Sequence, residues 1–229
     1  MKNFGIILPG RDNADKGITK FLRRNRFENI SIQEYGINFI VVYDDQNCGK
    51  IFFKNKVNNI ILLTDKQIEH CDFNIVDGYN IYKKMIPDVV RKTLKSKSSK
   101  KTVTLVDRTM SFDAEQMADR LLNVCSSITI ATENQEKAES VADILMEKYG
   151  AAINVIDGDS AISSAVAVVT KRCNNTYASD CIVIDNNCDK KYANSINDFY
   201  IPFKVKPPLG IRNTIFAQCI EITKEQNDA

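Results

Sequence analysis

Two polar segments in the middle of the chain carry the residue types best suited to binding a small charged ligand. Each follows a short apolar run, the first at residues 102–107 and the second at residues 127–132. Guanidinium, hydroxyl, amide and carboxylate groups at the end of a strand can contact a phosphate, a ribose or another anion. The candidate cofactor-binding residues are Asp107, Arg108, Thr109, Ser111, Glu133 and Asn134.

The first of these segments lacks the glycines that a dinucleotide site requires. Residues 107–113 contain no glycine, although bulky side chains keep a pyrophosphate away from the amides of the following helix. Asp107 also places a carboxylate where the phosphates would lie, while Arg108, Thr109 and Ser111 offer contacts to a different anion. Glu133 has the position of a ribose-binding acid, but a carboxylate in a first helical turn is also favoured by the helix dipole.

The elements around these segments predict an α/β fold. Apolar runs at residues 102–107, 127–132, 152–156, 165–170, 181–185 and 199–203 are typical of strands, and helices are expected at 113–124 and 134–149, the second ending at Gly150. Strands that alternate with helices favour a parallel sheet with right-handed crossovers. We therefore expect a Rossmann-like, doubly wound, mostly parallel sheet in the second half of the chain.

The first half predicts a smaller α+β domain. Strands are expected at residues 4–8, 30–35, 37–43, 50–53 and 59–63, two or three of them in an antiparallel meander, with Gly49 at a positive φ. Helices are expected at 14–24 and, with an interruption at 72–78, over 65–95, where Pro87 predicts a kink or a new helix start.

The polar, basic residues 96–101 predict a linker between two domains. The expected division is an N-terminal α+β domain at 1–95, the linker at 96–101 and a Rossmann-like domain at 102–229. A last helix at 214–224 is expected to return to the domain interface.

The second half resembles the nucleotide-binding domain of the shikimate dehydrogenase and glutamyl-tRNA reductase group. The resemblance rests on residues 130–142, on Tyr149-Gly150-Ala151 and on residues 165–170. It implies an NAD(P)-binding fold, but Glu133 stands near the position where this group usually has an arginine for the NADP phosphate. Binding of NAD is therefore compatible with this sequence, whereas binding of NADP is disfavoured. The loop 207–210 is similar to the Pro-Gly loop of folate dehydrogenases.

Other residues with possible chemistry have ordinary structural explanations. Asp157-Gly158-Asp159 and Asp185-Asn186-Asn187 follow predicted strands and offer oxygen ligands to a cation or a sugar, but they are also common turn residues. Neither the scattered cysteines nor His70 beside Cys71 has the spacing of a metal site or a catalytic dyad, so we expect no metal.

Composition sets the remaining expectations. A net charge of +2 and 26% charged residues do not favour nucleic acid or membrane binding, although the basic residues of 96–101 and 20–26 leave a nucleic-acid module open. We expect a cytoplasmic protein that binds a small anionic ligand or a protein partner between its domains, with a homodimer left open. The leading hypothesis is a non-catalytic or regulatory dehydrogenase relative, and the alternative is an NAD-dependent oxidoreductase with an atypical cofactor site.

Overall fold

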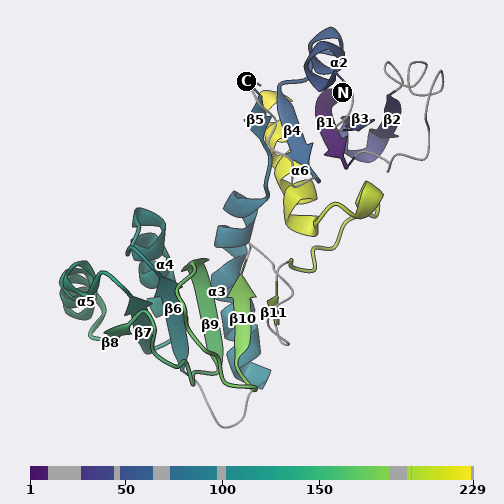
Figure 1. Ribbon diagram of the computed structural model, residues 1–229. Coiled ribbons are helices and arrows are strands. Elements are labelled where there is room, and N and C mark those ends of the chain that lie inside the picture. The colour runs from purple at the N-terminus through teal and green to yellow at the C-terminus, as the bar shows by residue number, and fades with distance from the viewer. Residues whose placement is uncertain are drawn as a thin grey trace. The chain divides into compact units, whose positions relative to one another are not determined.

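The structure is a computed structural model that describes residues 1–9, 27–43, 47–63, 73–96, 102–185, 195–196 and 198–227 (Figure 1). The chain forms two compact units. The first contains Met1–Ile81 and Tyr200–Ala229, and the second contains Tyr82–Phe199. Within the described part of the chain, no helix is long and apolar enough to cross a membrane.

The first unit is built on a five-stranded sheet with the order β2-β3-β1-β4-β5. Its strands are β1 (Lys2–Leu8), β2 (Glu28–Ile32), β3 (Ile37–Tyr43), β4 (Asn59–Leu62) and β5 (Asn74–Ile75). The pairs of β1 with β3 and β4, and of β4 with β5, are parallel, and β2 pairs antiparallel with β3. The expected antiparallel hairpin is thus present at β2–β3, whereas β4 lies parallel beside β1.

Helices α2 (Cys48–Lys54) and α6 (Asn213–Asn227) belong to this unit. The C-terminal segment contributes Ile215, Phe216 and Cys219 to the same buried cluster as Phe4 and Phe39 of the sheet. Burial of such side chains stabilises a fold by about 25 cal/mol for each Å² of apolar surface removed from water. The last helix is therefore part of the core of the first unit.

The second unit contains a six-stranded parallel sheet with the order β11-β10-β9-β6-β7-β8. Its strands are β6 (Val103–Asp107), β7 (Ser127–Thr132), β8 (Ala152–Asp157), β9 (Val166–Lys171), β10 (Ile182–Asp185) and β11 (Ser195–Ile196). Counted along the chain from β6, this is the order 3-2-1-4-5-6 of the Rossmann fold. The predicted Rossmann-like sheet is confirmed.

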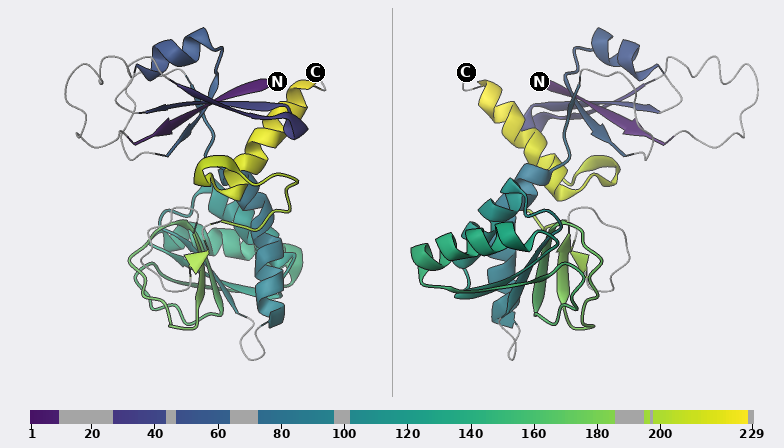
Figure 2. Two further views of the ribbon diagram at one scale, coloured as in Figure 1. Left: turned by 90° about the vertical axis from the view of Figure 1, so that its right-hand side faces the viewer. Right: turned by 60° about the vertical axis from the view of Figure 1, so that its left-hand side comes forward.

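Helices α4 (Phe112–Leu122) and α5 (Gln135–Tyr149) connect the first three of these strands and lie side by side (Figures 1 and 2). Helix α5 ends where predicted, because Gly150 adopts a φ of 61° and its N–H donates to the Met146 carbonyl at 2.8 Å. Helix α3 (Tyr79–Ser96) buries Tyr82, Ile86, Val90 and Leu94 along one face and continues through Pro87.

The two units differ from the division expected at residues 95 and 102. Most of α3 belongs to the second unit, where Tyr82 stacks on Phe199 with ring centroids 4.7 Å apart. Residues 200–229 belong to the first unit, although they follow the Rossmann-like segment in sequence. Residues 97–101 of the expected linker lie outside the described residues.

Several expected elements are corrected. Residues 50–53 belong to α2 and not to a strand, because the Asn47 side chain accepts a hydrogen bond from Lys50 N at 3.1 Å and caps a helix there. Gly49 lies inside this helix and has no positive φ. Residues 199–203 form no strand, and the sixth strand is Ser195–Ile196. The expected helix at 14–24, the basic residues 20–26, His70, Cys71, Asn186, Asn187 and Cys188 lie outside the described residues.

Candidate functional site

The carboxyl ends of β6 and β9 mark the point where the strand order of the second sheet reverses. Open α/β sheets bind their ligands outside the carboxyl ends of the strands at such a point. Asp107 ends β6 and Lys171 ends β9, and the Asp107 side chain is 0% exposed. The site is therefore organised around a buried carboxylate.

The Asp107 carboxylate binds the turn that follows its own strand. Its Oδ1 accepts hydrogen bonds from the backbone N–H groups of Thr109 at 3.0 Å and of Ser111 at 3.1 Å. Its Oδ2 accepts from the hydroxyls of Ser111 at 2.8 Å and Thr170 at 2.7 Å. Amides of the turn before a helix are the groups that bind phosphate in dinucleotide sites, and here an internal carboxylate already occupies them.

The turn itself keeps the backbone shape of a glycine turn without the glycine. Met110 has a φ of 48°, in the left-handed region that side chains rarely adopt, and its side chain is 0% exposed. Ser111 then begins α4, and its Oγ accepts a 3.4 Å hydrogen bond from Ala114 N. A thioether thus fills space that a glycine would leave open.

Backbone hydrogen bonds also continue past the strand ends. Arg108 N donates to the Lys171 carbonyl at 3.2 Å, and Glu133 N donates to the Arg108 carbonyl at 3.2 Å. These two bonds join the turn after β6 to the ends of both neighbouring strands. The turn is fixed on either side at the place where a Rossmann crevice opens.

Arg108 and Glu133 form an exposed ion pair above this layer. Arg108 Nε donates to Glu133 Oε2 at 3.0 Å, and the two side chains are 62% and 42% exposed. The hydrogen bond to Glu133 and the charge of that carboxylate raise the pKa of the guanidinium. Asn134 caps α5 by accepting from Lys137 N at 3.3 Å. Glu133 is therefore at the ribose position of a Rossmann fold but is engaged by Arg108.

Lys171 adds a second cation to this edge. Its Nζ donates to the Thr109 hydroxyl at 3.1 Å, and within the described part of the chain it makes no ion pair. The next residue differs, because Arg172 donates to Asp185 Oδ2 at 2.9 Å through Nε and at 2.8 Å through a terminal nitrogen. Lys171 is exposed, and its positive charge is not paired with a carboxylate among the described residues, whereas the charge of Arg172 is paired with the buried Asp185.

Cys173 lies close to the same charges. Burial, followed by the charges of the Glu133, Asp107 and Asp159 carboxylates, raises the pKa of its thiol to about 11. A thiol with this pKa is protonated at neutral pH and is a poor nucleophile. Cys173 is not suited to covalent catalysis in this environment.

The turn after β8 lies at the same edge of the sheet, beside the end of β7. Asp157 Oδ1 accepts from Asp159 N at 2.8 Å, so the segment is an aspartate turn of the ordinary kind. Gly158 packs closely, since a Cβ built there would lie 3.0 Å from Glu133 N. Across the residues that the structure describes, no three His, Cys, Asp or Glu side chains gather in a way that could hold a metal ion.

All six residues predicted for a cofactor site lie at this edge. Asp107 and Ser111 hold the turn internally, whereas Arg108, Thr109 and Glu133 are accessible and Asn134 caps a helix. Three contributors were not predicted: Met110, Thr170 and Lys171. Thr170 and Lys171 were detectable in principle, because they are the polar residues that end the strand beyond the switch point.

No family model matches the chain, and no curated protein matches it. Among solved structures, the chain is similar to quinate dehydrogenase from Corynebacterium glutamicum in complex with NAD, with 10% identity over 74% of this chain and 70% of that one and a TM-score of 0.30. A shikimate dehydrogenase in complex with NADP+ matches at 14% identity over 80% and 76%, with a TM-score of 0.34. Shikimate dehydrogenase from Mycobacterium tuberculosis matches at 14% identity over 75% and 71%, with a TM-score of 0.29.

The three structures are one quinate dehydrogenase and two shikimate dehydrogenases. Their identities and TM-scores are low, so the Rossmann-like assignment rests on the strand order of the second unit.

Proposed function

We propose that this chain is a non-catalytic, regulatory binding protein on a Rossmann-like scaffold, and that it binds a small anion instead of a dinucleotide. The observation that carries the proposal is the Asp107 carboxylate, which accepts hydrogen bonds from the amides of Thr109 and Ser111. A pyrophosphate at these amides would have to displace a buried, hydrogen-bonded carboxylate and would meet its negative charge.

The anion would bind outside this layer, between Arg108 and Lys171. Only Nε of Arg108 is engaged by Glu133, so its terminal nitrogens stay available to a carboxylate or a phosphate. Lys171 and the Thr109 hydroxyl supply a charge and a hydrogen-bond donor on the other side of the turn. A ligand with a single carboxylate or phosphate fits these groups better than a dinucleotide does.

Calorimetric titration tests the proposal with NAD+, NADH, NADP+ and NADPH, and with inorganic phosphate and succinate as small anions. We expect no binding of the dinucleotides at millimolar concentration and measurable binding of at least one small anion. Lys171→Ala and Arg108→Ala should each weaken that binding about tenfold, the effect of losing about 1.4 kcal/mol. Lys92→Ala, an exposed lysine on α3, is the matched control and should leave binding unchanged.

An NAD-dependent oxidoreductase is the second candidate, and the position of Glu133 favours it. Glu133 directly follows β7, where a Rossmann domain holds the adenosine ribose. If NAD(H) binds and Glu133→Ala abolishes that binding, the non-catalytic proposal is wrong. Reduction of NAD+ with shikimate or quinate present, followed by absorbance, would lead to the same conclusion.

A further inference from the structure

Strand β8 forms the outer edge of the second sheet. It pairs with β7 on one side, and no segment among the described residues pairs with its other side. Edge strands expose unpaired N–H and C=O groups, and proteins usually protect them with lysine, proline or a bulge. Residues Ala152–Asp157 contain neither lysine nor proline, and their pairing with β7 has no register shift. Among the residues that the structure describes, the outer side of β8 is thus unpaired and can take an additional strand.

Helix α5 places negative charge along this edge. Gln135 at its start donates to Asp157 Oδ2 at 3.4 Å, which locates one side of the helix over β8. Glu139 and Asp143 follow Gln135 at intervals of four residues, so they lie along the same side of the helix, and both are exposed. Together with Asp157 they form an acidic stripe beside the open strand.

The lysines of α5 are directed away from this stripe. Lys137 pairs with Glu115 of α4 at 2.6 Å, and Lys148 pairs with Asp119 of α4 at 2.6 Å. In the described part of the chain, Glu139 and Asp143 make no ion pair. The side of α5 that faces α4 is thus neutralised by ion pairs, whereas the carboxylates of Glu139 and Asp143 on the side next to β8 are not.

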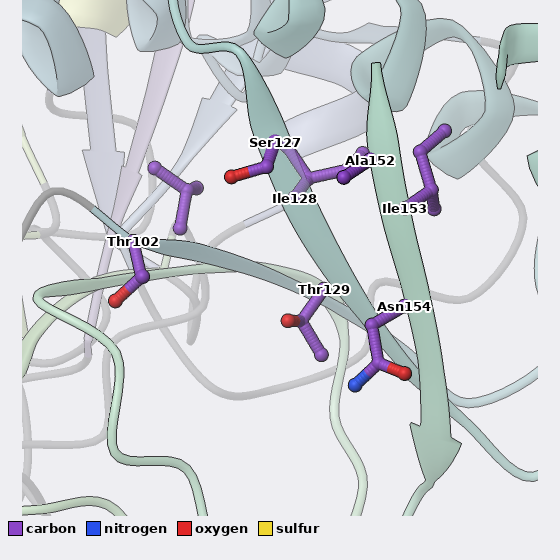
Figure 3. Close-up of a pocket in the computed structure, with 8 residues that line it drawn as sticks. Thr102, Ser127, Ile128, Thr129, Ala152, Ile153 and Asn154 are labelled. Atoms are coloured by element: carbon purple, nitrogen blue, oxygen red, sulfur yellow. The ribbon is translucent and has the colours of Figure 1, made fainter.

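The opposite face of β8 carries no charged side chain. Ala152 and Asn154 are exposed there, and Asn154 lies in register with Thr129 of β7. Figure 3 shows Ala152, Asn154 and Thr129 among the residues that line a pocket at this part of the sheet, which also include Ile128 and Ile153, and the volume of the pocket is about 210 Å³. A strand added at β8 would meet carboxylates on one face of the sheet and the uncharged side chains of Ala152 and Asn154 on the other.

We propose that β8 accepts an extended basic segment of a partner protein as a seventh strand. Successive side chains of a strand point to opposite faces. The segment should therefore alternate lysine or arginine, facing Glu139, Asp143 and Asp157, with small polar residues that face Ala152 and Asn154. Main-chain hydrogen bonds would supply affinity, and the alternating pattern would supply specificity.

Charge complementarity selects this partner over a second copy of the chain. Pairing two β8 strands antiparallel would bring the acidic flanks of two α5 helices together, and like charges across an interface are unfavourable. The acidic stripe therefore opposes self-pairing and attracts a basic strand. This inference does not depend on the proposed anion site at Arg108 and Lys171.

Fluorescence anisotropy with the full chain and a labelled peptide of alternating lysine and threonine tests the proposal. The control peptide has the same composition with its lysines grouped together. We expect the alternating peptide to bind more tightly, with affinity that falls as salt rises. The double variant Glu139→Lys/Asp143→Lys should weaken binding at least about tenfold. The control variant Glu34→Lys/Glu225→Lys, with the same change in net charge in the first unit, should not.

Amide hydrogen exchange provides the second measurement. Strand addition should slow exchange in β8 on binding of the alternating peptide, whereas binding through charge alone would not. Equal binding of both peptides, or binding without protection of β8, would overturn the proposal. The proposal would also be overturned if the chain self-associates and the Glu139→Lys/Asp143→Lys variant changes that self-association, because β8 would then be an interface between copies.

Discussion

The Thr170 hydroxyl donates a 2.7 Å hydrogen bond to Oδ2 of Asp107 and thereby joins β9 to β6 across the switch point of the sheet. A switch point normally opens into a ligand crevice, because the connections on its two sides leave in opposite directions. Here a side-chain bond and the Arg108–Lys171 backbone bond tie the two strand ends together. The edge is consequently a fixed platform that presents Arg108, Thr109 and Lys171.

Replacement of Asp107 by asparagine should destabilise the second unit by about 2–4 kcal/mol. The carboxylate accepts from two amides and from hydroxyls of Ser111 and Thr170, and an amide nitrogen in place of one oxygen would face these donors without accepting from them. Urea unfolding, followed by a probe in the second unit, measures the loss. Asp157→Asn, in an exposed aspartate turn, is the control and should change stability by less than about 1 kcal/mol. Equal effects of the two substitutions would contradict the role of Asp107.

At position 110, the glycine variant should be at least as stable as the alanine variant, the reverse of the usual order of stability in a helix. Met110 has a φ of 48°, where glycine is unstrained and alanine is not, so Met110→Gly should be as stable as Met110→Ala or up to about 1 kcal/mol more stable. Both variants lose the buried thioether and should be less stable than the wild type. Met117, buried in α4, is the matched control, since glycine there should be worse than alanine by about 1 kcal/mol. Thermal unfolding of the four variants gives the comparison, and the same order at both positions would refute the strain argument.

The reactivity of Cys173 should rise steeply only at high pH. The pKa of its thiol is raised from 9.0 to about 11 by burial and by Glu133, Asp107 and Asp159. The neutral thiol therefore contributes stability below about pH 9, and this contribution is lost as pH rises through about 11. Alkylation by iodoacetamide, mapped by mass spectrometry, measures the thiolate fraction.

Glu133→Gln separates the two causes of this pKa shift. It removes a carboxylate that raises the pKa of Cys173 and releases Arg108, whose charge lowers it, so Cys173 should be alkylated a few-fold faster. Cys125 also has a pKa raised to about 11, but burial alone raises it, and its rate should not change. An equal change at both cysteines would indicate local unfolding in place of an electrostatic effect.

Gly78→Ala should destabilise the first unit by more than about 2 kcal/mol. Gly78 has a φ of +77°, and a Cβ there would lie 2.6 Å from the backbone nitrogen of Ile215 at the start of α6. Gly36 has a similar φ of +66°, but a Cβ there would lie no closer than 3.9 Å to Thr223, so Gly36→Ala should cost only about 1 kcal/mol. Chemical unfolding of the first unit compares the two. Equal losses would mean that the contact with α6 adds nothing to the conformational cost.

The sequence by itself determined the Rossmann-like order of elements in the second unit. Five of the expected strands coincide with β6 to β10 within one residue at each end, and Gly150 ends α5 where predicted. These features are encoded locally, because apolar periodicity and a left-handed stop depend on residues close in the chain. The same local reasoning failed at residues 50–53, where a short apolar run suits a strand or a helix and the Asn47 cap selected the helix.

Only the tertiary structure decided how distant residues combine. Residues 200–229 joined the first unit because Ile215, Phe216 and Cys219 share its buried cluster, a contact that no local pattern specifies. The absence of glycine after β6 was visible in the sequence. The sequence did not reveal that Asp107 accepts hydrogen bonds from the turn amides, or that Thr170 binds Asp107 from another strand. Residues separated by 63 positions meet only when the sheet forms, so the chemistry of this edge is a property of the fold.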